Sequence, residues 1–569
     1  MPTVEVVGSG PAVDSLTEFL ADIDVALTRS STPAESPADL SVAVDTVGAT
    51  TFESASSRAR DAGTPWVAVE LGGVGGVPVT DAAISGFGPE TACFDCLRRR
   101  VEATVDGSES PTEAPSAATQ RFAGALAGRL LTQFFDGERG LFGTVVELPH
   151  TERRFLPVPG CDCGDSPSRR LDAGRQTAHD SEALSRAEIG LDDRVGIVEE
   201  VGEARSFPAP YYLSTLADTA GFSDVTAPRQ AAGVAVDWDT AFMKALGESY
   251  ERYAAGVYRV ADLPTETVES RTDAVHPSTF VRDKSGWDDE TAIPWFPVKD
   301  LASGTERSVP AETVLYPPPS NAVRTATTTG LGLGNTVTEA LLTGLYEVVE
   351  RDAAMLSWYS TFDPLRVAAG DHDRFDTLRR RAQSEGLEVT PLLLTQDVDV
   401  PVVTVALEGE SWPRFALGTD ADLDPGAAAV GALEEALQNW MELDGMGPDG
   451  AKEAEGAIGR YAESPGDAAG MTDTETAVPL DSLGPEAELS GEAELDALCE
   501  RTSDAGLTPY AARITTRDLE QLGFEAVRVV CPSAQPLFFG EAFFGERAER
   551  VPSDMGFEPR LDRDHHPFP

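Results

Sequence analysis

The chain has 569 residues, 96 acidic and 44 basic side chains, a formal net charge of −52 and a sequence pI near 4.3. At about 100–200 residues per domain, this length predicts two to four domains. The hydrophobic content of 41% excludes an acidic disordered chain. No apolar run approaches the about 18 residues of a membrane span, and residues 1–5 lack the basic region of a signal peptide. We therefore expect a soluble, cytoplasmic protein with no membrane partner.

Lysine is almost absent, because only Lys244, Lys284, Lys299 and Lys452 occur in the chain. An acidic excess spread along the whole sequence is typical of a surface that stays hydrated in molar salt, where the Debye length is about 3 Å. This favours a salt-loving cytoplasm over an acidic interaction tail. The strongly negative electrostatic potential of such a surface would repel phosphate groups, which argues against nucleic acid as a partner. A bound nucleotide would need a metal ion to bridge its phosphates to acidic side chains.

The first 165 residues predict a small α/β domain with a degenerate Rossmann-like start. A strand at residues 4–7 leads through Gly8-Ser9-Gly10-Pro11 into a helix at 12–20, and strands at 66–70 and 143–148 alternate with a helix near 117–135. A glycine turn of this kind can cradle a phosphate. Here the third glycine of the dinucleotide fingerprint is missing and Pro11 interrupts the pattern. We therefore interpret the turn as part of the scaffold.

Polar, turn-rich residues 166–190 predict a linker, and residues 191–569 predict a larger α/β domain. The fold class expected for the whole chain is thus α/β (α+β) in two domains. Residues 444–494 are rich in Gly, Ala, Pro and acidic side chains, with little apolar periodicity. This composition predicts a mobile insertion in the larger domain.

Four of the six cysteines are paired by their spacing, as Cys93-x-x-Cys96 and Cys161-x-Cys163. Two such pairs can donate four thiolates to one tetrahedral ion, which predicts a closed structural zinc site between the middle and the end of the first domain. The alternatives are redox pairs or disulfides, and a cytosolic location disfavours disulfides. The remaining Cys499 and Cys531 are predicted to be core residues.

Two helical segments of the larger domain repeat one pattern of charged residues. The string Glu-x-x-Glu-Arg-x-Ala-Ala begins at Glu248 and returns at Glu347. Residues three and four apart share one face of a helix, so each helix presents two carboxylates side by side. A third helix, at residues 427–443, places Glu435 and Gln438 at the same spacing.

Adjacent carboxylates repel one another unless a cation lies between them. Several pairs that converge suit a site for Mg²⁺ and a triphosphate. The alternative is ordinary exposed Glu-Arg pairing, which is common in acidic proteins. The apolar surroundings of both copies favour the cation site.

These strings resemble the three ATP-site motifs of the YcaO family, at residues 245–252, 344–353 and 433–438. The loop at 327–334 resembles the turn before the second motif, and the tail at 565–569 resembles the proline-rich C-terminus of the family. The first domain, with its paired cysteines, resembles the E1/ThiF-like docking domain fused to YcaO in azoline-forming systems. The whole chain is thus similar to SagD-like cyclodehydratase and docking proteins of the thiazole/oxazole-modified microcin type, here of haloarchaeal character.

The resemblance implies an ATP-dependent enzyme that activates peptide backbone amides. A Cys, Ser or Thr side chain adds to the preceding carbonyl, ATP phosphorylates the resulting oxygen, and elimination gives an azoline; thioamidation uses the same activation with sulfide. The implied cofactors are ATP, Mg²⁺ and structural zinc. The residues implied for ATP and Mg²⁺ are Glu248, Glu251, Arg252, Glu347, Glu350, Glu435 and Gln438, with Glu248, Glu251, Glu347 and Glu350 on the metal. The C-terminal carboxylate of Pro569 is implied in proton transfer.

Several positions depart from the family pattern. Lys244 stands where the first motif has serine, Ala340 and Thr343 replace a serine and an asparagine, and Asn439 follows the glutamine in place of an arginine. The missing arginine leaves a non-catalytic docking scaffold as an alternative. The expected partners are a ribosomal precursor peptide or a protein substrate, with a flavin dehydrogenase for azoles or a sulfur-delivery partner for thioamides. A homodimer is also expected by resemblance.

Overall fold

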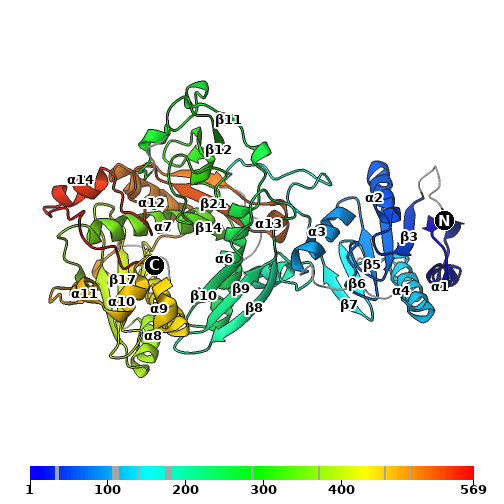
Figure 1. Ribbon diagram of the computed structural model, residues 1–569, viewed down its shortest axis with the longest axis horizontal. Helices are drawn as coiled ribbons and strands as arrows, with labels where there is room; N and C mark the ends of the chain where they lie inside the picture. Colours follow the sequence, from blue (N-terminus) through cyan, green and yellow to red (C-terminus); the bar gives the residue numbers. More distant parts are fainter. Residues whose placement is uncertain are drawn as a thin grey trace.

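The computed structural model describes residues 1–31, 38–105, 115–138, 140–172, 182–283, 287–369, 372–453, 456–485 and 488–569. Over these residues the chain forms four β-sheets with helices packed on them, which confirms the predicted mixed α/β class. The N-terminal portion lies at one end of an elongated molecule, and the remaining sheets and helices form the other end (Figure 1). No helix within these ranges combines the length and apolar character needed to cross a bilayer.

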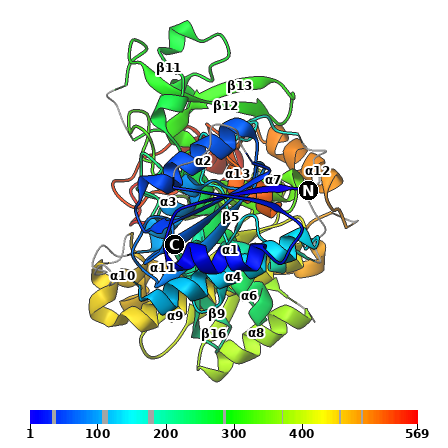
Figure 2. The ribbon, with the colours of Figure 1, turned by 90° about the vertical axis from the view of Figure 1, so that its right-hand side faces the viewer.

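The N-terminal portion is a seven-stranded sheet in the order β2-β1-β3-β4-β5-β6-β7. The first four strands in this order are parallel and the last three are antiparallel to their neighbours. Helices α1 and α4 cover one face, and α2 and α3 lie on the other (Figure 2). The strands are β1 (Thr3–Val7), β2 (Ala26–Ser30), β3 (Leu40–Thr46), β4 (Trp66–Leu71), β5 (Ala82–Phe87), β6 (Thr144–Glu147) and β7 (Thr151–Arg154), and the helices are α1 (Pro11–Leu20), α2 (Thr50–Ala62), α3 (Phe94–Thr104) and α4 (Ala117–Phe135).

The buried parallel strands send alternate side chains to the two faces of this sheet. Val42 and Val44 of β3 pack with α1 and α4, whereas Ala43 packs in the core cluster that contains α2 and α3. The turn after β1 needs glycine for a steric reason. Gly8 has φ of 138°, and a Cβ atom there would lie 2.4 Å from the carbonyl oxygen of Val44.

The larger portion contains three antiparallel or mixed sheets. The first consists of β8 (Val198–Arg205), β9 (Tyr211–Leu216) and β10 (Gln230–Val234). The second consists of β11 (Thr265–Glu266), β12 (Ile293–Asp300), β13 (Glu306–Pro310), β14 (Leu331–Gly334), β20 (Tyr510–Arg513) and β21 (Glu525–Val530). The third runs β18-β17-β16-β15-β19, formed by β15 (Leu365–Ala368), β16 (Glu388–Leu393), β17 (Val402–Glu408), β18 (Phe415–Ala421) and β19 (Ala477–Pro479).

Three long helices join these sheets: α6 (Trp238–Gly256), α7 (Val337–Trp358) and α9 (Pro425–Gly450). Each begins at a side chain that accepts a hydrogen bond from the first turn, supplied by Asp237, Thr336 and Asp424 respectively. Helix α6 packs on β9 and β10, α7 lies between β14, β21 and β18, and α9 packs on β17 and β18. The other helices are α5 (Ala183–Ala187), α8 (Asp373–Ser384), α10 (Ile458–Glu463), α11 (Gly466–Ala469), α12 (Glu492–Asp504), α13 (Arg517–Leu522) and α14 (Arg547–Asp554).

The described parts of the predicted linker (166–190) and of the predicted mobile insertion (444–494) make contacts with the larger portion. Within 444–494, β19 pairs with β15, and Tyr461 and Met471 are buried. Within 166–190, the carbonyl of Ser168 accepts a hydrogen bond from Arg513 at 2.6 Å, and Leu171 is buried. Residues 173–181 of the predicted linker lie outside the described residues. The mobility of 444–494 stays a prediction.

A buried ion pair joins the two portions of the chain. Arg100 of α3 pairs with Asp518 of α13, and both side chains are almost fully buried. The Tyr253 hydroxyl of α6 donates to the same Asp518 carboxylate at 2.6 Å, and Arg100 also donates to the carbonyl of Pro157 at 2.9 Å. One core cluster continues from α2 and α3 into α6 and the sheets of the larger portion. The two portions therefore share a core.

Replacement of one partner in this ion pair should be costly. Arg100→Met leaves the Asp518 carboxylate buried without its cation, so we expect the free energy of unfolding to fall by about 3–5 kcal/mol. Arg550→Met is the matched control, because its pair with Asp554 is exposed and should be worth at most about 1 kcal/mol. Denaturant unfolding at one fixed high salt concentration measures both. Equal losses in the two variants would contradict a structural role for the buried pair.

Candidate active site

Helices α6, α7 and α9 enclose a cavity of about 700 Å³. All seven residues that the repeated motifs predicted for the site line this one cavity: Glu248, Glu251, Arg252, Glu347, Glu350, Glu435 and Gln438. Four further acids line it, namely Glu339, Asp420, Asp422 and Glu434. The cations of the lining are Lys244, Arg252 and Arg351. Negative charge therefore greatly exceeds positive charge in the cavity wall.

Backbone amides at strand and loop ends hold the motif glutamates in place. Ala232 N–H of β10 donates to Glu248 Oε2 at 2.7 Å, and Leu333 N–H of β14 donates to Glu251 Oε1 at 3.0 Å. Gly330 N–H, in the loop before β14, donates to Glu347 Oε2 at 2.8 Å. Each of these three carboxylates accepts one backbone hydrogen bond on one of its two oxygens. Sheet edges thus orient the charged groups that the helices carry.

Thr419 of β18 connects the second and third motif helices. Its hydroxyl donates to Glu350 Oε1 at 2.5 Å, and its backbone N–H donates to Glu435 Oε2. Glu350 on α7 and Glu435 on α9 therefore meet at a single strand residue. Two motifs far apart in the sequence are brought together in this way.

Burial opposes ionisation of several of these acids. Desolvation, followed by the nearby charges of Glu248 and Glu347, raises the pKa of Glu251 to about 8. Desolvation likewise raises the pKa of Asp420 to about 8 and raises the pKa values of Glu347 and Glu350, although Arg351 opposes the shift of the last two. Carboxylates in this state lack sufficient positive charge around them. A bound divalent cation would supply it.

Arg351 is a site residue that the sequence analysis did not single out. Its Nη1 donates to the terminal Pro569 oxygen at 2.6 Å, and its Nη2 lies 3.5 Å from Glu435 Oε1. Its Nε lies 3.3 Å from Glu350 Oε1. The arginine therefore connects the C-terminus to the carboxylates of the cavity. Arg351 directly follows Glu350, just as Arg252 directly follows Glu251. This equivalence in the repeated string could have identified Arg351 as a site residue.

Lys244 and Asp420 were also missed as site residues. Lys244 Nζ of α6 lies 2.5 Å from Glu434 Oε2 of α9, so this ion pair crosses between the first and third motif helices. Asp420 follows Thr419 on β18 and belongs to no helical motif, so only the fold could reveal it. Asn439, in the position expected for an arginine, donates its side-chain amide to the Leu417 carbonyl at 2.8 Å. This side chain therefore serves the packing of α9 on β18.

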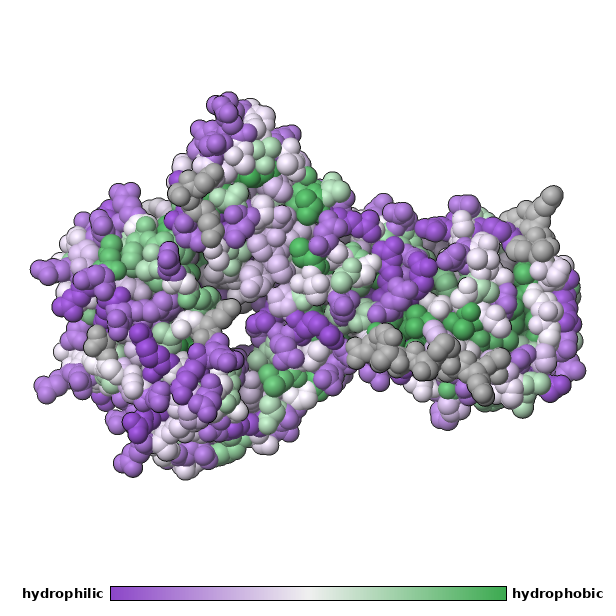
Figure 3. Space-filling view, viewed as in Figure 1, coloured by the Kyte–Doolittle hydropathy of each residue, from purple (hydrophilic) through white to green (hydrophobic). Residues whose placement is uncertain are grey.

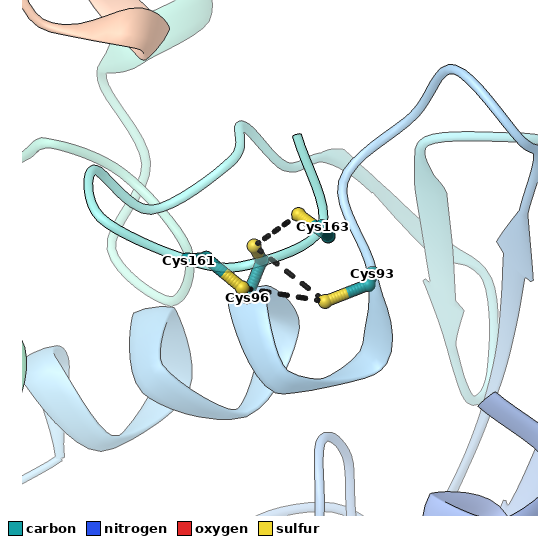
Figure 4. Close-up of side chains that lie close together, drawn as sticks. All are labelled: Cys93, Cys96, Cys161 and Cys163. Atoms are coloured by element: carbon teal, nitrogen blue, oxygen red, sulfur yellow. Dashed lines mark hydrogen bonds between the residues drawn. The ribbon is translucent and has the colours of Figure 1, made fainter. Parts of the chain in front are cut away.

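The four predicted cysteine ligands form a second cluster, in the N-terminal portion. Cys93 and Cys96 lie at the start of α3, Cys161 and Cys163 lie on the loop after β7, and the four sulfur atoms point toward one another (Figure 4). All four ligand atoms lie within 4.8 Å of one another. The Sγ–Sγ distances are 3.8 Å for Cys93–Cys96, 3.6 Å for Cys93–Cys161 and 3.5 Å for Cys96–Cys163.

These distances are compatible with a zinc site and show no disulfide among the four cysteines. A disulfide needs about 2.05 Å, and all four thiols are free. A tetrahedron with Zn–S bonds of about 2.3 Å has edges of about 3.8 Å, close to the observed distances. Val158 N–H donates to Cys96 Sγ and Arg517 Nη1 donates to Cys163 Sγ, both at 3.3 Å. Such donors are typical of the surroundings of metal-bound thiolates. Cys531 is buried, and Cys499 is partly buried.

Comparisons with known proteins place the chain in a family. The family model described as YcaO cyclodehydratase, ATP- and Mg²⁺-binding, matches residues 232–535, which is more than half of the chain. The protein therefore belongs to the YcaO cyclodehydratase family. It is similar to an uncharacterized protein of Methanothermobacter thermautotrophicus, at 27% identity over 308 residues that cover 51% of this chain and 78% of the relative.

Two solved structures share the fold over nearly the whole chain. A heterocyclase in complex with substrate and cofactor has a TM-score of 0.74 at 19% identity, and covers 98% of this chain and 83% of its own. The heterocyclase TruD has a TM-score of 0.66 at 20% identity, with 100% of this chain and 84% of its own covered. The N-terminal portion is therefore part of a shared architecture.

The residues of the cavity fit the ATP and Mg²⁺ of the family. Carboxylate oxygens are the ligands that Mg²⁺ prefers, and the motif helices supply them from three directions. The volume of about 700 Å³ lies within the about 300–1,000 Å³ range of small-molecule sites. Burial and the charges of Glu248 and Glu347 raise the pKa of Glu251, and a divalent cation among these carboxylates would favour their ionised form.

The raised pKa of Glu251 predicts a pH effect on stability. Since its pKa is about 8 in the fold against an ordinary value of 4.5, the neutral carboxyl stabilises the fold fully below about pH 4.5. This stabilisation is lost as pH rises through about 8. In metal-free buffer, Glu251→Gln should therefore gain stability relative to the parent protein between about pH 5 and 8, by up to about 1.4 kcal/mol per unit.

Unfolding of both proteins by denaturant across this pH range measures the difference. Glu549→Gln, at an exposed position of α14, is the control and should show no trend with pH. A difference for Glu251→Gln that does not change with pH would contradict the raised pKa.

Proposed function

We propose that the protein uses Mg²⁺ and ATP to phosphorylate a backbone amide oxygen of a peptide, which yields an azoline at a Cys, Ser or Thr residue. The observation that carries this proposal is the convergence of the three motif helices on one acidic cavity. When bound, ATP supplies the phosphoryl group that turns the amide oxygen into a leaving group. Catalysis of phosphoryl transfer depends mainly on positioning and charge, and the cavity supplies both.

The proposed roles follow from where each side chain is held. Glu248, Glu251, Glu347 and Glu350 hold Mg²⁺, since their oxygens are fixed by backbone amides or by Thr419 and face a shared cavity. Glu435 and Gln438 on α9 complete the contacts to the nucleotide and its metal. Arg252 donates to both Glu248 and the carbonyl of Gln230, so it orients a metal ligand.

Arg351 supports catalysis over a docking scaffold. The scaffold alternative rested on the arginine missing at position 439, whereas Arg351 places a guanidinium in the wall of the acidic cavity. The side chain is 14% exposed and lies next to Glu350 and Glu435. It also holds Pro569, whose terminal carboxylate we propose takes up the proton that leaves the attacking side chain or amide.

Removal of a metal-holding carboxylate tests this assignment. Purified protein in molar KCl should hydrolyse ATP only with Mg²⁺, and Glu347→Gln should lower kcat by about 10²–10³-fold. Glu385→Gln, at an exposed position after α8, is the matched control and should retain activity. Phosphate release in the presence of a Cys-containing peptide measures both variants. Full activity of Glu347→Gln, or no ATP turnover by the parent protein, would contradict the proposed function.

We also propose that the four cysteines hold a structural zinc ion and that the N-terminal portion docks a ribosomal precursor peptide. The sulfur distances and the two surrounding donors support the zinc assignment. The shared core and the Arg100–Asp518 pair support the docking role, because they fix this portion rigidly against α6. The ion ties the loop after β7 to α3 and has no part in the chemistry.

Metal analysis tests the zinc assignment. Freshly isolated protein should contain about one zinc per chain, because a closed four-thiolate site retains its ion through purification. Cys163→Ser should lose most of the metal, whereas Cys499→Ser, which changes a cysteine outside the cluster, should retain it. Less than about half an equivalent in the parent protein would count against the assignment.

A further inference from the structure

A second cavity, of about 660 Å³, adjoins the acidic cavity and has no role in the function proposed so far. The two cavities share four lining residues: Ala232, Glu248, Arg252 and Gln438. In the space-filling view an opening passes through the molecule in the region bounded by α6, β10 and α9 (Figure 3). The acidic cavity and the second cavity therefore meet at these four shared residues.

The second cavity has a different chemistry from the first. Its charged lining residues are balanced, with Arg205 and Arg252 against Glu248 and Glu442. It therefore has no excess charge with which to hold phosphates or a metal ion. A ligand in this cavity would be bound mainly through apolar contacts and hydrogen bonds.

Apolar side chains line this cavity and are open to solvent. Leu213 is 39% exposed and Met446 is 47% exposed, whereas Met441, which also lines the cavity, is buried. Methionine adapts its shape to different partners and recurs on surfaces that bind varied peptides. On a protein of net charge −52, an exposed leucine and methionine at one cavity indicate a binding role.

Hydrogen-bonded polar groups form the wall beside the apolar side chains. The Tyr211 hydroxyl donates to Glu442 Oε1 at 3.0 Å, and Gln438 Nε2 donates to the same oxygen at 3.1 Å. Arg205 pairs with Asp444 at 2.5 Å near the end of α9. Gln438 thus belongs to this network and also to the wall of the acidic cavity. A group bound in the second cavity would contact the same residue as the nucleotide.

We propose that the second cavity is the acceptor subsite, which holds the peptide segment that contains the reacting amide. An apolar side chain next to the reacting Cys, Ser or Thr would pack against the exposed Leu213 and Met446. This inference rests on the proposed function, because phosphoryl transfer needs the acceptor oxygen in line with the terminal phosphate. The shared lining at Glu248, Arg252 and Gln438 places the acceptor directly beside the carboxylates proposed to hold the metal.

The test compares two synthetic peptides, each with a single cysteine, preceded by leucine in one and by glutamate in the other. For the parent protein, the leucine peptide should have the lower KM for dehydration, followed by mass spectrometry as loss of one water. Met446→Glu should raise the KM of the leucine peptide about tenfold, the usual size of one hydrophobic pocket contact. The KM of ATP should stay unchanged. Met446→Leu should restore the parent value.

Met555→Glu is the matched control, because Met555 is also exposed, at 37%, and lies after α14 outside the cavity. It should leave both KM values unchanged, and thermal unfolding should show that both glutamate variants are folded. An unchanged peptide KM in Met446→Glu would overturn the inference, and so would a rise confined to the KM of ATP.

Peptide binding separates this inference from the proposed function. If the parent protein turns over no ATP, the proposed function is wrong, but fluorescence anisotropy with the labelled leucine peptide still reports on the cavity. Weaker binding to Met446→Glu than to Met555→Glu would then support a peptide site. Equal binding to both would overturn it.

Discussion

Repulsion among buried carboxylates is the constraint on which the rest of the structure depends. Glutamates from α6, α7 and α9 meet in one cavity, with few cations in its wall. Burial raises the pKa values of Glu251, Glu347 and Glu350, so ionising these carboxyls is costly unless a bound cation offsets their charge. The backbone amides of β10, β14 and the loop before β14 keep the carboxylates apart and oriented.

Helices α3, α13 and α6 connect the cysteine cluster to the acidic cavity. Helix α3 carries Cys96 and, one turn later, Arg100. Helix α13 carries Arg517, which donates to Cys163, and Asp518, which pairs with Arg100. Tyr253 lies two residues after Glu251 on α6, and its hydroxyl donates a hydrogen bond to Asp518. The N-terminal portion is thus held directly against the helix that carries Glu248 and Glu251, the first pair of carboxylates proposed to hold the metal.

Local pattern predicted much of the fold and most of the candidate site. The helical spacing of Glu347 and Glu350, repeated from α6, indicated the cavity-facing carboxylates because periodicity alone puts them on one face. The cysteine spacing indicated the four-sulfur cluster for a similar reason. The mixed α/β class followed from alternating strands and helices in the first domain.

Contacts between distant segments could not be predicted in this way. Asp420 enters the cavity from β18, and Lys244 pairs with Glu434 from another helix, so their proximity depends on how the sheets pack. The packed elements within 444–494 depend on a few buried residues such as Tyr461 and Met471 in a polar background. The second cavity arises only where β9, β10 and the end of α9 meet.

Calorimetric titration with a non-hydrolysable ATP analogue tests the central claim most directly, because it needs neither a peptide nor turnover. In molar KCl we predict saturable binding with Mg²⁺ present and no detectable binding once the metal is chelated, since the carboxylates repel free triphosphate. Binding of equal strength with and without Mg²⁺ would show that the acidic cavity does not work through a cation, and would contradict the account.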